Sequence, residues 1–133
     1  MQKINEKIES IFAEKNIVGE NGNKVPVVFA NYTGIEEKVP PSYIVYTDTG
    51  EPQVLMHGDG VVMVQRCQYD FMVYTQKRYF SIVQQLTNIL KEAGFKEVSE
   101  GADGFDNQLK YYFKRLSFSI LCNGNGDVIN GRF

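Results

Sequence analysis

The spacing of apolar residues changes several times along the chain, and each change marks an expected element. From Gln2 to Glu14, apolar side chains recur at helical spacing with glutamate and lysine between them. The apolar positions are Ile4, Ile8, Ile11 and Phe12. This pattern predicts an amphipathic helix over Gln2–Glu14, followed by the glycine and asparagine turn formers of residues 19–24.

Short runs of β-branched and aromatic residues come next. Residues 25–32 predict the start of a strand or an edge strand, because Pro26 cannot donate a ladder hydrogen bond. Residues 36–42 (EEKVPPS) predict a loop, since adjacent prolines fit neither a helix interior nor a central strand. Ser42–Asp48 (SYIVYTD) predicts a strand.

Two further extended runs, residues 53–57 and 61–64, predict a hairpin. They are joined by Gly-Asp-Gly at 58–60, and glycine at both ends of that turn supplies the positive φ that a tight hairpin needs. The hairpin has fewer core positions than the strand it leads into, so we expect residues 49–60 to protrude as an arm. The residues assigned to the arm are Glu51, Gln53, Leu55, His57 and Asp59.

The strand that continues from the hairpin has one apolar and one polar face. Its apolar positions, interrupted only by Gln65, are Met63, Cys67, Tyr69, Phe71 and Val73. The other face presents Arg66, Gln68 and Asp70. Because successive side chains of a strand point to opposite sides of the sheet, one face is expected in the core and the other is expected to be polar.

A second amphipathic helix follows with no glycine or proline before it. Thr75 is the expected N-cap, its hydroxyl accepting an N–H of the first turn, and Gly94 is the expected left-handed C-terminal cap. The apolar stripe is formed by Ile82, Val83, Leu86, Ile89, Leu90 and Ala93. The opposite side carries no cluster of reactive groups, so we interpret strand and helix as scaffold.

The last part of the chain returns to strand-like patterns. Residues 95–101 predict a short strand, residues 102–108 a turn-rich connector, and residues 109–122 a long alternating strand. Residues 123–133, with their Asn-Gly pairs, predict a short hairpin or a tail. The order of elements predicts one α+β domain over residues 1–133: an antiparallel β-sheet with one long amphipathic helix packed on one face and a second, N-terminal helix.

Composition narrows the classes of partner. Hydrophobic residues make up 43% of the chain and charged residues 23%, as in soluble globular proteins. A formal net charge of -2 gives no electrostatic case for binding nucleic acid. No signal peptide and no run of membrane-spanning length is apparent. Cys67 and Cys122 are expected to be buried thiols of a cytosolic protein, with a disulfide or a metal pair as the alternative.

Few residues are candidates for catalysis. His57 is the only histidine, and a hairpin turn is a poor place to desolvate and orient an acid–base pair with Asp59. The GxSxG and HExxH motifs are absent, and Asp103, Asp106 and Asn107 lack the length and terminal glutamate of a calcium-binding loop. We therefore expect no catalytic residue, no cofactor and no metal ion, and a protein that is not an enzyme.

The polar side of the sheet is a candidate subunit interface. It combines alternate residues of the two long strands: Arg66, Gln68, Asp70, Arg115, Ser117 and Ser119. Mixed charges and hydroxyls favour contact with another copy of the chain over contact with nucleic acid. A polar face that is merely solvated is the alternative.

Three segments in order resemble the tail-completion or tail-terminator proteins of long-tailed bacteriophages. They are the leading helix, the strand PSYIVY at 41–46 and the segment VQRCQYDFMVYTQKRYFSIVQQLTNIL at 64–90. In that family a strand opened by Pro and Tyr precedes a long alternating strand, which passes through a short polar turn into an amphipathic helix. The resemblance extends over residues 4–94 and consists of patterns of residue type.

The resemblance implies a structural virion protein of a phage or prophage. Such proteins form a homo-oligomeric ring, commonly hexameric, that caps the tail tube, stops its polymerisation and joins it to the head connector. The implied partners are other copies of the chain, the tube protein and the connector protein, with DNA only as transient cargo and no membrane. The implied locations are the host cytoplasm during assembly and the tail–head junction of the virion.

Two alternatives to the tail terminator stay open. One is a small ligand-binding module or enzyme with a pocket between helix and sheet. The other is a different head–tail joining protein of the same virion, which shares most of the expected properties and differs in the partner it binds.

Overall fold

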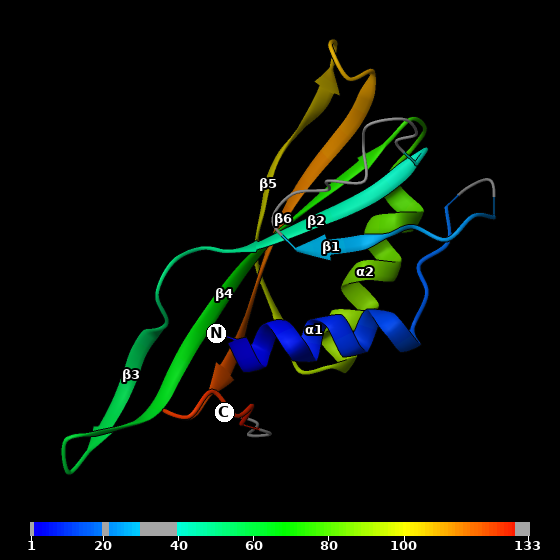
Figure 1. Ribbon diagram of the computed structural model, residues 1–133. Helices are drawn as coiled ribbons and strands as arrows, with labels where there is room; N and C mark the ends of the chain where they lie inside the picture. The colour runs from blue at the N-terminus through cyan, green and yellow to red at the C-terminus, as the bar shows by residue number, and fades with distance from the viewer. Residues whose placement is uncertain (1, 20–21, 30–39, 130–133) are drawn as a thin grey trace.

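The computed structural model describes residues 2–19, 22–29 and 40–129, which form a mixed α+β protein (Figure 1). Within these ranges, two helices accompany one six-stranded, mostly antiparallel sheet. The expected α+β class is confirmed. The end of the predicted run at 25–32, most of the predicted loop at 36–42 and the last four residues of the segment 123–133 lie outside the described residues.

The sheet has the strand order β1-β2-β4-β6-β5, and β3 pairs with the first part of β4. The strands are β1 (Val27–Phe29), β2 (Ser42–Asp48), β3 (Gln53–Gly58), β4 (Val61–Thr75), β5 (Lys96–Asp106) and β6 (Tyr111–Cys122). β1 and β2 are parallel, so the sheet is not wholly antiparallel as expected. The side-chain pattern of one strand does not indicate the direction of the neighbouring strand. The parallel pairing of β1 and β2 was therefore not predictable from the sequence.

One core joins both helices to the middle strands. α1 (Gln2–Glu14) and α2 (Phe80–Glu92) are each 13 residues long, so neither is the longer one. Their buried side chains meet alternate side chains of β4 and β6 together with two from β2. The main members are Ile4, Ile8, Ile44, Tyr46, Cys67, Tyr69, Phe71, Val73, Leu86, Leu90, Leu116 and Phe118. Figure 1 shows both helices beside the middle strands, away from the outer end of β3.

The start of α2 differs from the prediction. Thr75 is the last residue of β4, not an N-cap, and its buried hydroxyl lies 2.7 Å from the hydroxyl of Ser42 on β2. The helix begins five residues later, after Tyr79, which makes no side-chain capping bond. A buried partner on the neighbouring strand thus competes for the Thr75 hydroxyl. The C-terminal prediction is confirmed, because Gly94 has φ 100° and the Phe95 N–H donates to the Leu90 carbonyl at 2.9 Å.

β5 is longer than predicted. It continues to Asp106 through residues that were expected to be a connector, and the turn lies at residues 107–110. A Cβ on Gly101 would lie 3.0 Å from the Arg115 side chain, and one on Gly104 would lie 3.1 Å from Phe113. These glycines therefore let large side chains of β6 lie across β5, and two register shifts accommodate the irregular segment.

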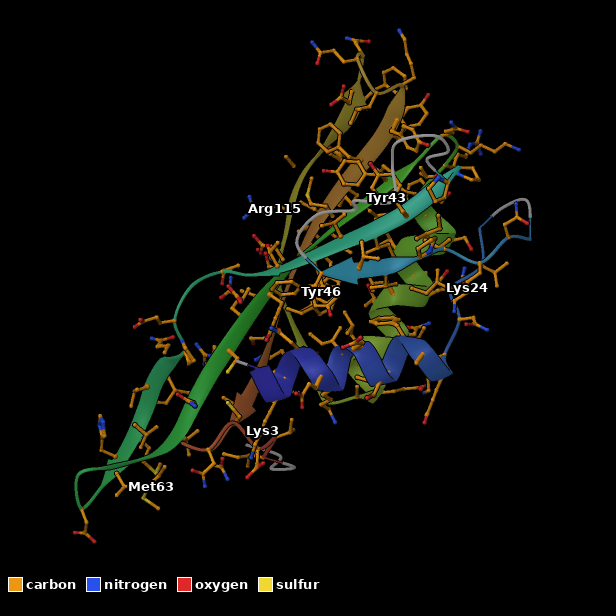
Figure 2. The ribbon with its side chains drawn as sticks, viewed as in Figure 1. Lys3, Lys24, Tyr43, Tyr46, Met63 and Arg115 are labelled. Carbon is orange, nitrogen blue, oxygen red and sulfur yellow. The ribbon has the colours of Figure 1, made fainter. Side chains whose placement is uncertain are left out.

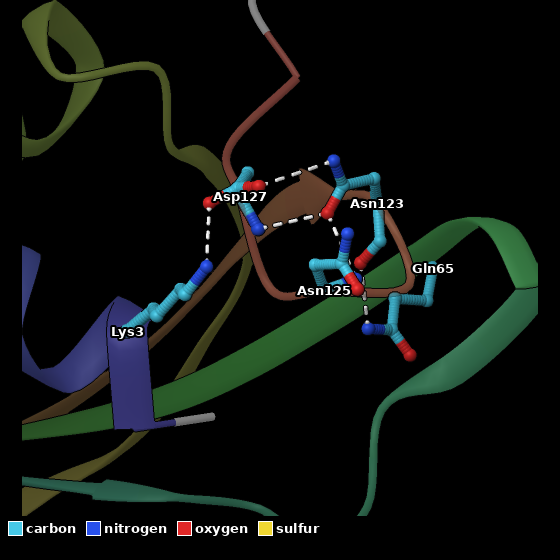
Figure 3. Close-up of polar contacts among 5 residues, drawn as sticks. All are labelled: Lys3, Gln65, Asn123, Asn125 and Asp127. Carbon is cyan, nitrogen blue, oxygen red and sulfur yellow. Dashed lines mark hydrogen bonds and ion pairs between the residues drawn. The ribbon is translucent and has the colours of Figure 1, made fainter.

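The C-terminal segment folds back against the sheet (Figure 3). The Asn123 side-chain oxygen accepts hydrogen bonds from the backbone N–H groups of Asn125 and Asp127, both at 2.9 Å, which closes a tight turn. The Asp127 carboxylate also pairs with the Lys3 ammonium of α1 at 3.0 Å. The Gln65 amide of β4 donates to the Asn123 carbonyl at 2.9 Å. The turn thus links α1 to the middle of β4.

Candidate interface surfaces

The register of β4 and β6 brings most of the predicted interface residues together. Gln68 lies opposite Ser119 and Asp70 lies opposite Ser117. Arg115 is opposite Met72, two pairs further along the ladder. The structure therefore assembles a continuous polar strip over two neighbouring strands.

Asp70 is the centre of this strip. Its carboxylate accepts a hydrogen bond from the Ser117 hydroxyl at 2.6 Å and pairs with the Arg115 guanidinium. The Asp70 side chain is only 12% exposed, and Ser117 is buried. Ser119 is buried as well, since β6 is an interior strand flanked on both sides. These groups already satisfy one another, so a partner gains little by binding them, and their interface role stays a prediction.

Arg66 stands apart from that network. Its guanidinium donates to the Gln53 side chain of β3 at 3.4 Å, so it lies where the arm joins the sheet. Next to it is an open hollow of about 260 Å³. The hollow is lined by Arg66, Gln68, Lys96, Glu97, Val98 and Ser119. It combines both signs of charge and contains no group that would select one ligand.

The arm, residues 49–64 with β3 and the first residues of β4, forms a hairpin with a tight turn. Positive φ occurs at Asp59 (51°) and Gly60 (77°), not at both glycines as expected. Two successive positive φ angles in an Asp-Gly turn match the right-handed twist of the strands it connects. The pairing runs from Gly58 opposite Val61 to Gln53 opposite Arg66, with two register shifts around Met56.

Most apolar side chains of the arm are exposed, and Val62 and Val64 are partly buried. The exposed group, which we call the arm's apolar residues, comprises Val54, Leu55, Met56, Val61 and Met63. Met63 is 52% exposed, whereas Phe71 on the same strand is fully buried. Figure 2 shows Met63 near the outer end of the arm, far from Tyr46 in the core. Met63 is thus not part of the core face on which the sequence pattern placed it, while Cys67, Tyr69, Phe71 and Val73 are.

The C-terminal turn lies against the β4 strand of the arm. A Cβ on Gly124 would lie 2.5 Å from the Val62 carbonyl oxygen, so the two backbones touch there. Gln65 donates to the Asn123 carbonyl three residues further along β4. Two further side-chain bonds of the arm join the Arg66 guanidinium to Gln53 and the Thr49 hydroxyl to the Gln68 carbonyl. The C-terminal turn thus holds the β4 strand of the arm at Val62 and Gln65, while most residues of β3 are exposed.

A second exposed surface lies at the other end of β4 and was missed by sequence reasoning. We call it the far-end surface: a hollow of about 580 Å³ lined by Gln76, Lys77, Arg78, Tyr79, Phe80 and Tyr112. Phe80 is 74% exposed although it opens a helix. Lys77 and Arg78 are exposed and form no ion pair among the described residues. The sequence signal that could have indicated this surface is the run QKRYF at residues 76–80, which combines basic and aromatic residues between a strand and a helix.

One side of the far-end surface is fixed by a strong hydrogen bond. The Tyr79 hydroxyl donates to the Asp103 carboxylate of β5 at 2.6 Å. This bond raises the pKa of Tyr79 and lowers the pKa of Asp103 from their ordinary values. The Tyr79 ring lies 5.4 Å from the Phe80 ring, centroid to centroid, so the bond also positions the neighbouring aromatic side chain.

The two cysteines lie together in the core. Their sulfur atoms are 3.1 Å apart, and both thiols are free and buried, as expected. Burial, followed by the contact with Cys122, raises the pKa of the Cys67 thiol. A thiol with a raised pKa is a weak nucleophile.

The remaining chemistry-bearing residues do not converge. His57 is exposed on the arm. In the described ranges, no three His, Cys, Asp or Glu side chains are grouped so as to hold a metal ion. None of the helices in those ranges is long and apolar enough to cross a membrane. In comparisons with known proteins, no family model matches the sequence and no curated protein sequence matches it.

Proposed function

We propose that the chain is a structural subunit of a ring that caps a bacteriophage tail tube and joins it to the head connector. The observation that carries the proposal is the arm, an extended hairpin whose apolar residues are exposed while those of the rest of β4 are buried. Clusters of exposed apolar side chains on a soluble protein are typical of surfaces that bind other proteins. The resemblance to tail terminators provides the biological context.

In this proposal the body of the protein is a scaffold. α2 packs on one face of the sheet, and α1 completes the same core, so that the arm and the polar strip keep fixed positions relative to each other. The role requires surfaces and no catalytic group, cofactor or metal. The subunits assemble in the host cytoplasm and remain at the tail–head junction of the virion, where DNA passes through the ring.

The arm provides the direct test. Residues 53–60 are replaced by a short Gly-Ser linker in the phage or prophage that encodes the chain. The subunit is expected to stay folded, because this segment contributes no residue to the core cluster. Electron microscopy is expected to show unjoined heads and tails of uncontrolled length. The matched control is Val18→Ser/Leu109→Ser, which removes exposed apolar side chains from other parts of the molecule instead.

Each outcome bears on a different part of the proposal. Joined virions with tails of normal length from the linker variant would contradict a role for the arm. Complete deletion of the chain with no effect on tails would contradict the tail-terminator function itself. Binding to a portal-side ring but not to the tube would assign the chain to another class of head–tail joining protein.

A ligand-binding module is the second candidate. It is favoured by an open hollow of about 490 Å³ beside α1, lined by apolar residues together with Glu9, Lys15 and Lys24. A thermal-shift screen with metabolites separates the two functions when it is combined with size measurements over a concentration series. A ligand-dependent increase in melting temperature with a persistent monomer would favour this candidate.

A further inference from the structure

The two exposed surfaces at the ends of β4 are complementary in charge. Between residues 49 and 65 the arm carries Glu51 and Asp59 and no lysine or arginine. The far-end surface presents Lys77 and Arg78 and no acidic residue in its lining. Both acidic residues and both basic residues are exposed. Opposite charges on two surfaces of one molecule favour contact between copies of that molecule.

The same two surfaces also match in their apolar parts. The arm offers the flexible side chains Leu55 and Met56, and the far-end surface offers the faces of Phe80 and Tyr112, all of them exposed. Methionine adapts its shape to a partner and makes favourable contacts with aromatic rings. A hollow of about 580 Å³ has room for several side chains of a hairpin.

The arm of one chain does not reach its own far-end surface. β4 has 15 residues and separates the hairpin turn from Gln76. At the usual rise of about 3.4 Å per residue, the strand alone keeps these regions roughly 48 Å apart. Figure 1 shows the hairpin and the start of α2 at opposite ends of β4. A contact between them therefore requires a second copy of the chain.

We propose that the arm of one copy docks on the far-end surface of the next copy, head to tail. Asp59 at the hairpin turn then faces Lys77 and Arg78, and the arm's apolar residues cover Phe80 and Tyr112. A head-to-tail contact uses two different surfaces on each subunit, so repetition builds a ring when the rotation between neighbours closes. The inference names the subunit contact of the proposed ring and in that sense rests on the proposed function.

A charge exchange tests the contact. Glu51→Lys/Asp59→Lys and Lys77→Glu/Arg78→Glu are each expected to weaken self-association by at least about tenfold in sedimentation velocity, because like charges then face each other. An equimolar mixture of the two variants restores opposite charges at every contact when the two chains alternate, and one chain with all four changes restores them as well. Both the mixture and the fourfold variant are therefore expected to associate as before. Lys7→Glu/Lys91→Glu, which lowers the net charge by the same amount elsewhere, is the control for Lys77→Glu/Arg78→Glu.

A cross-link tests the geometry independently of affinity. Met56→Cys and Phe80→Cys are made in separate chains, since the two natural cysteines are buried. Under an oxidant such as oxidised glutathione, the two thiolates form a disulfide between chains while the oxidant is reduced to two thiols. The mixture is expected to yield a cross-linked dimer, and each variant by itself is expected to yield much less. Circular dichroism and urea unfolding confirm that every variant is folded.

The outcomes separate this inference from the proposed function. Unchanged association in both charge variants, or no cross-link at any concentration of the mixture, would overturn the head-to-tail contact even if the chain caps tail tubes. Strong cross-linking of Met56→Cys with itself would indicate a two-fold contact and would also overturn it. Head-to-tail cross-linking by a chain that has no effect on phage tails would leave this inference standing and contradict the proposed function.

Discussion

The two halves of β4 have similar side-chain patterns and opposite environments. The first half comprises residues 61–66, and its apolar residues Val61 and Met63 are exposed. In the second half, Cys67, Tyr69, Phe71 and Val73 are fully buried at the same alternate spacing. The first half pairs with β3, whose residues are almost all exposed, and the second half pairs with β2 and β6 beneath the helices. Apolar alternation therefore shows that a strand has an apolar face, and neighbouring elements decide whether that face is covered.

The difference has an energetic meaning. A two-stranded hairpin by itself is marginally stable in water, so the arm depends on the contacts at its base. The second half contributes to stability through burial, at roughly 1.5–3 kcal/mol for each large apolar side chain before conformational entropy is considered. We expect substitutions in the second half to affect folding and substitutions in the outer arm to affect association.

The largest expected effect is in the core. Phe71→Ala is expected to lower the free energy of unfolding by about 3–5 kcal/mol, because it leaves a cavity among packed rings. The Phe71 ring lies 5.5 Å from Tyr46 and 5.7 Å from Phe118, centroid to centroid. Met63→Ala, on the same face of the same strand, is expected to change the free energy of unfolding by less than about 0.5 kcal/mol. Urea unfolding of both variants is the measurement, and equal effects would contradict the division of β4.

An intermediate effect is expected where the C-terminal turn contacts the arm. Gly124→Ala places a Cβ 2.5 Å from the Val62 carbonyl oxygen, and backbone atoms must shift to relieve the contact. We expect a loss of about 1–3 kcal/mol in the free energy of unfolding. Faster amide hydrogen exchange in residues 53–66 than in residues 67–75 would show that the loss is local to the arm.

Asn125→Ala is the control for that variant. It lies in the same turn, but only its backbone N–H is bonded, to Asn123 at 2.9 Å. Its effect on stability and on exchange of the arm is expected to be small. A Gly124→Ala protein with unchanged exchange in residues 53–66 would show that the C-terminal turn does not hold the arm.

The smallest expected effect concerns pH. The hydrogen bond from Lys3, aided by Asn123 and by the charge of Lys3, holds the pKa of Asp127 below its ordinary value. A lowered pKa in the folded state contributes stability above the ordinary aspartate pKa, and this contribution is lost as the pH falls through the folded-state pKa. Lys3→Ala is expected to raise the pKa of Asp127. The variant is therefore expected to lose slightly less stability on acidification than the unchanged protein does.

The measurement is an NMR titration of the Asp127 carboxyl group, combined with urea unfolding at neutral and acidic pH. Lys15→Ala is the control, because Lys15 pairs with Glu92 and not with Asp127. An Asp127 pKa that does not change in Lys3→Ala would show that the ion pair does not link α1 to the turn beside the arm.

The sequence determined most of the elements and the main core. Helical periodicity marked α1 and the apolar stripe of α2, and strict alternation marked β4 from Cys67 to Val73 and β6 from Leu116 to Cys122. The left-handed conformation of Gly94 also followed from local chemistry, since glycine adopts it without steric cost. These features depend on residues close in sequence, and their signals are therefore present in the sequence itself.

The tertiary structure decided the rest. Thr75 ends a strand because Ser42 lies beside it, β5 extends through Gly101 and Gly104 because β6 side chains cover them, and Met63 is exposed because no helix reaches the arm. The far-end surface joins residues 76–80 to Tyr112 across adjacent strands, and no sequence pattern connects them. Each of these features depends on contacts between distant segments, and such contacts form only when the chain is folded.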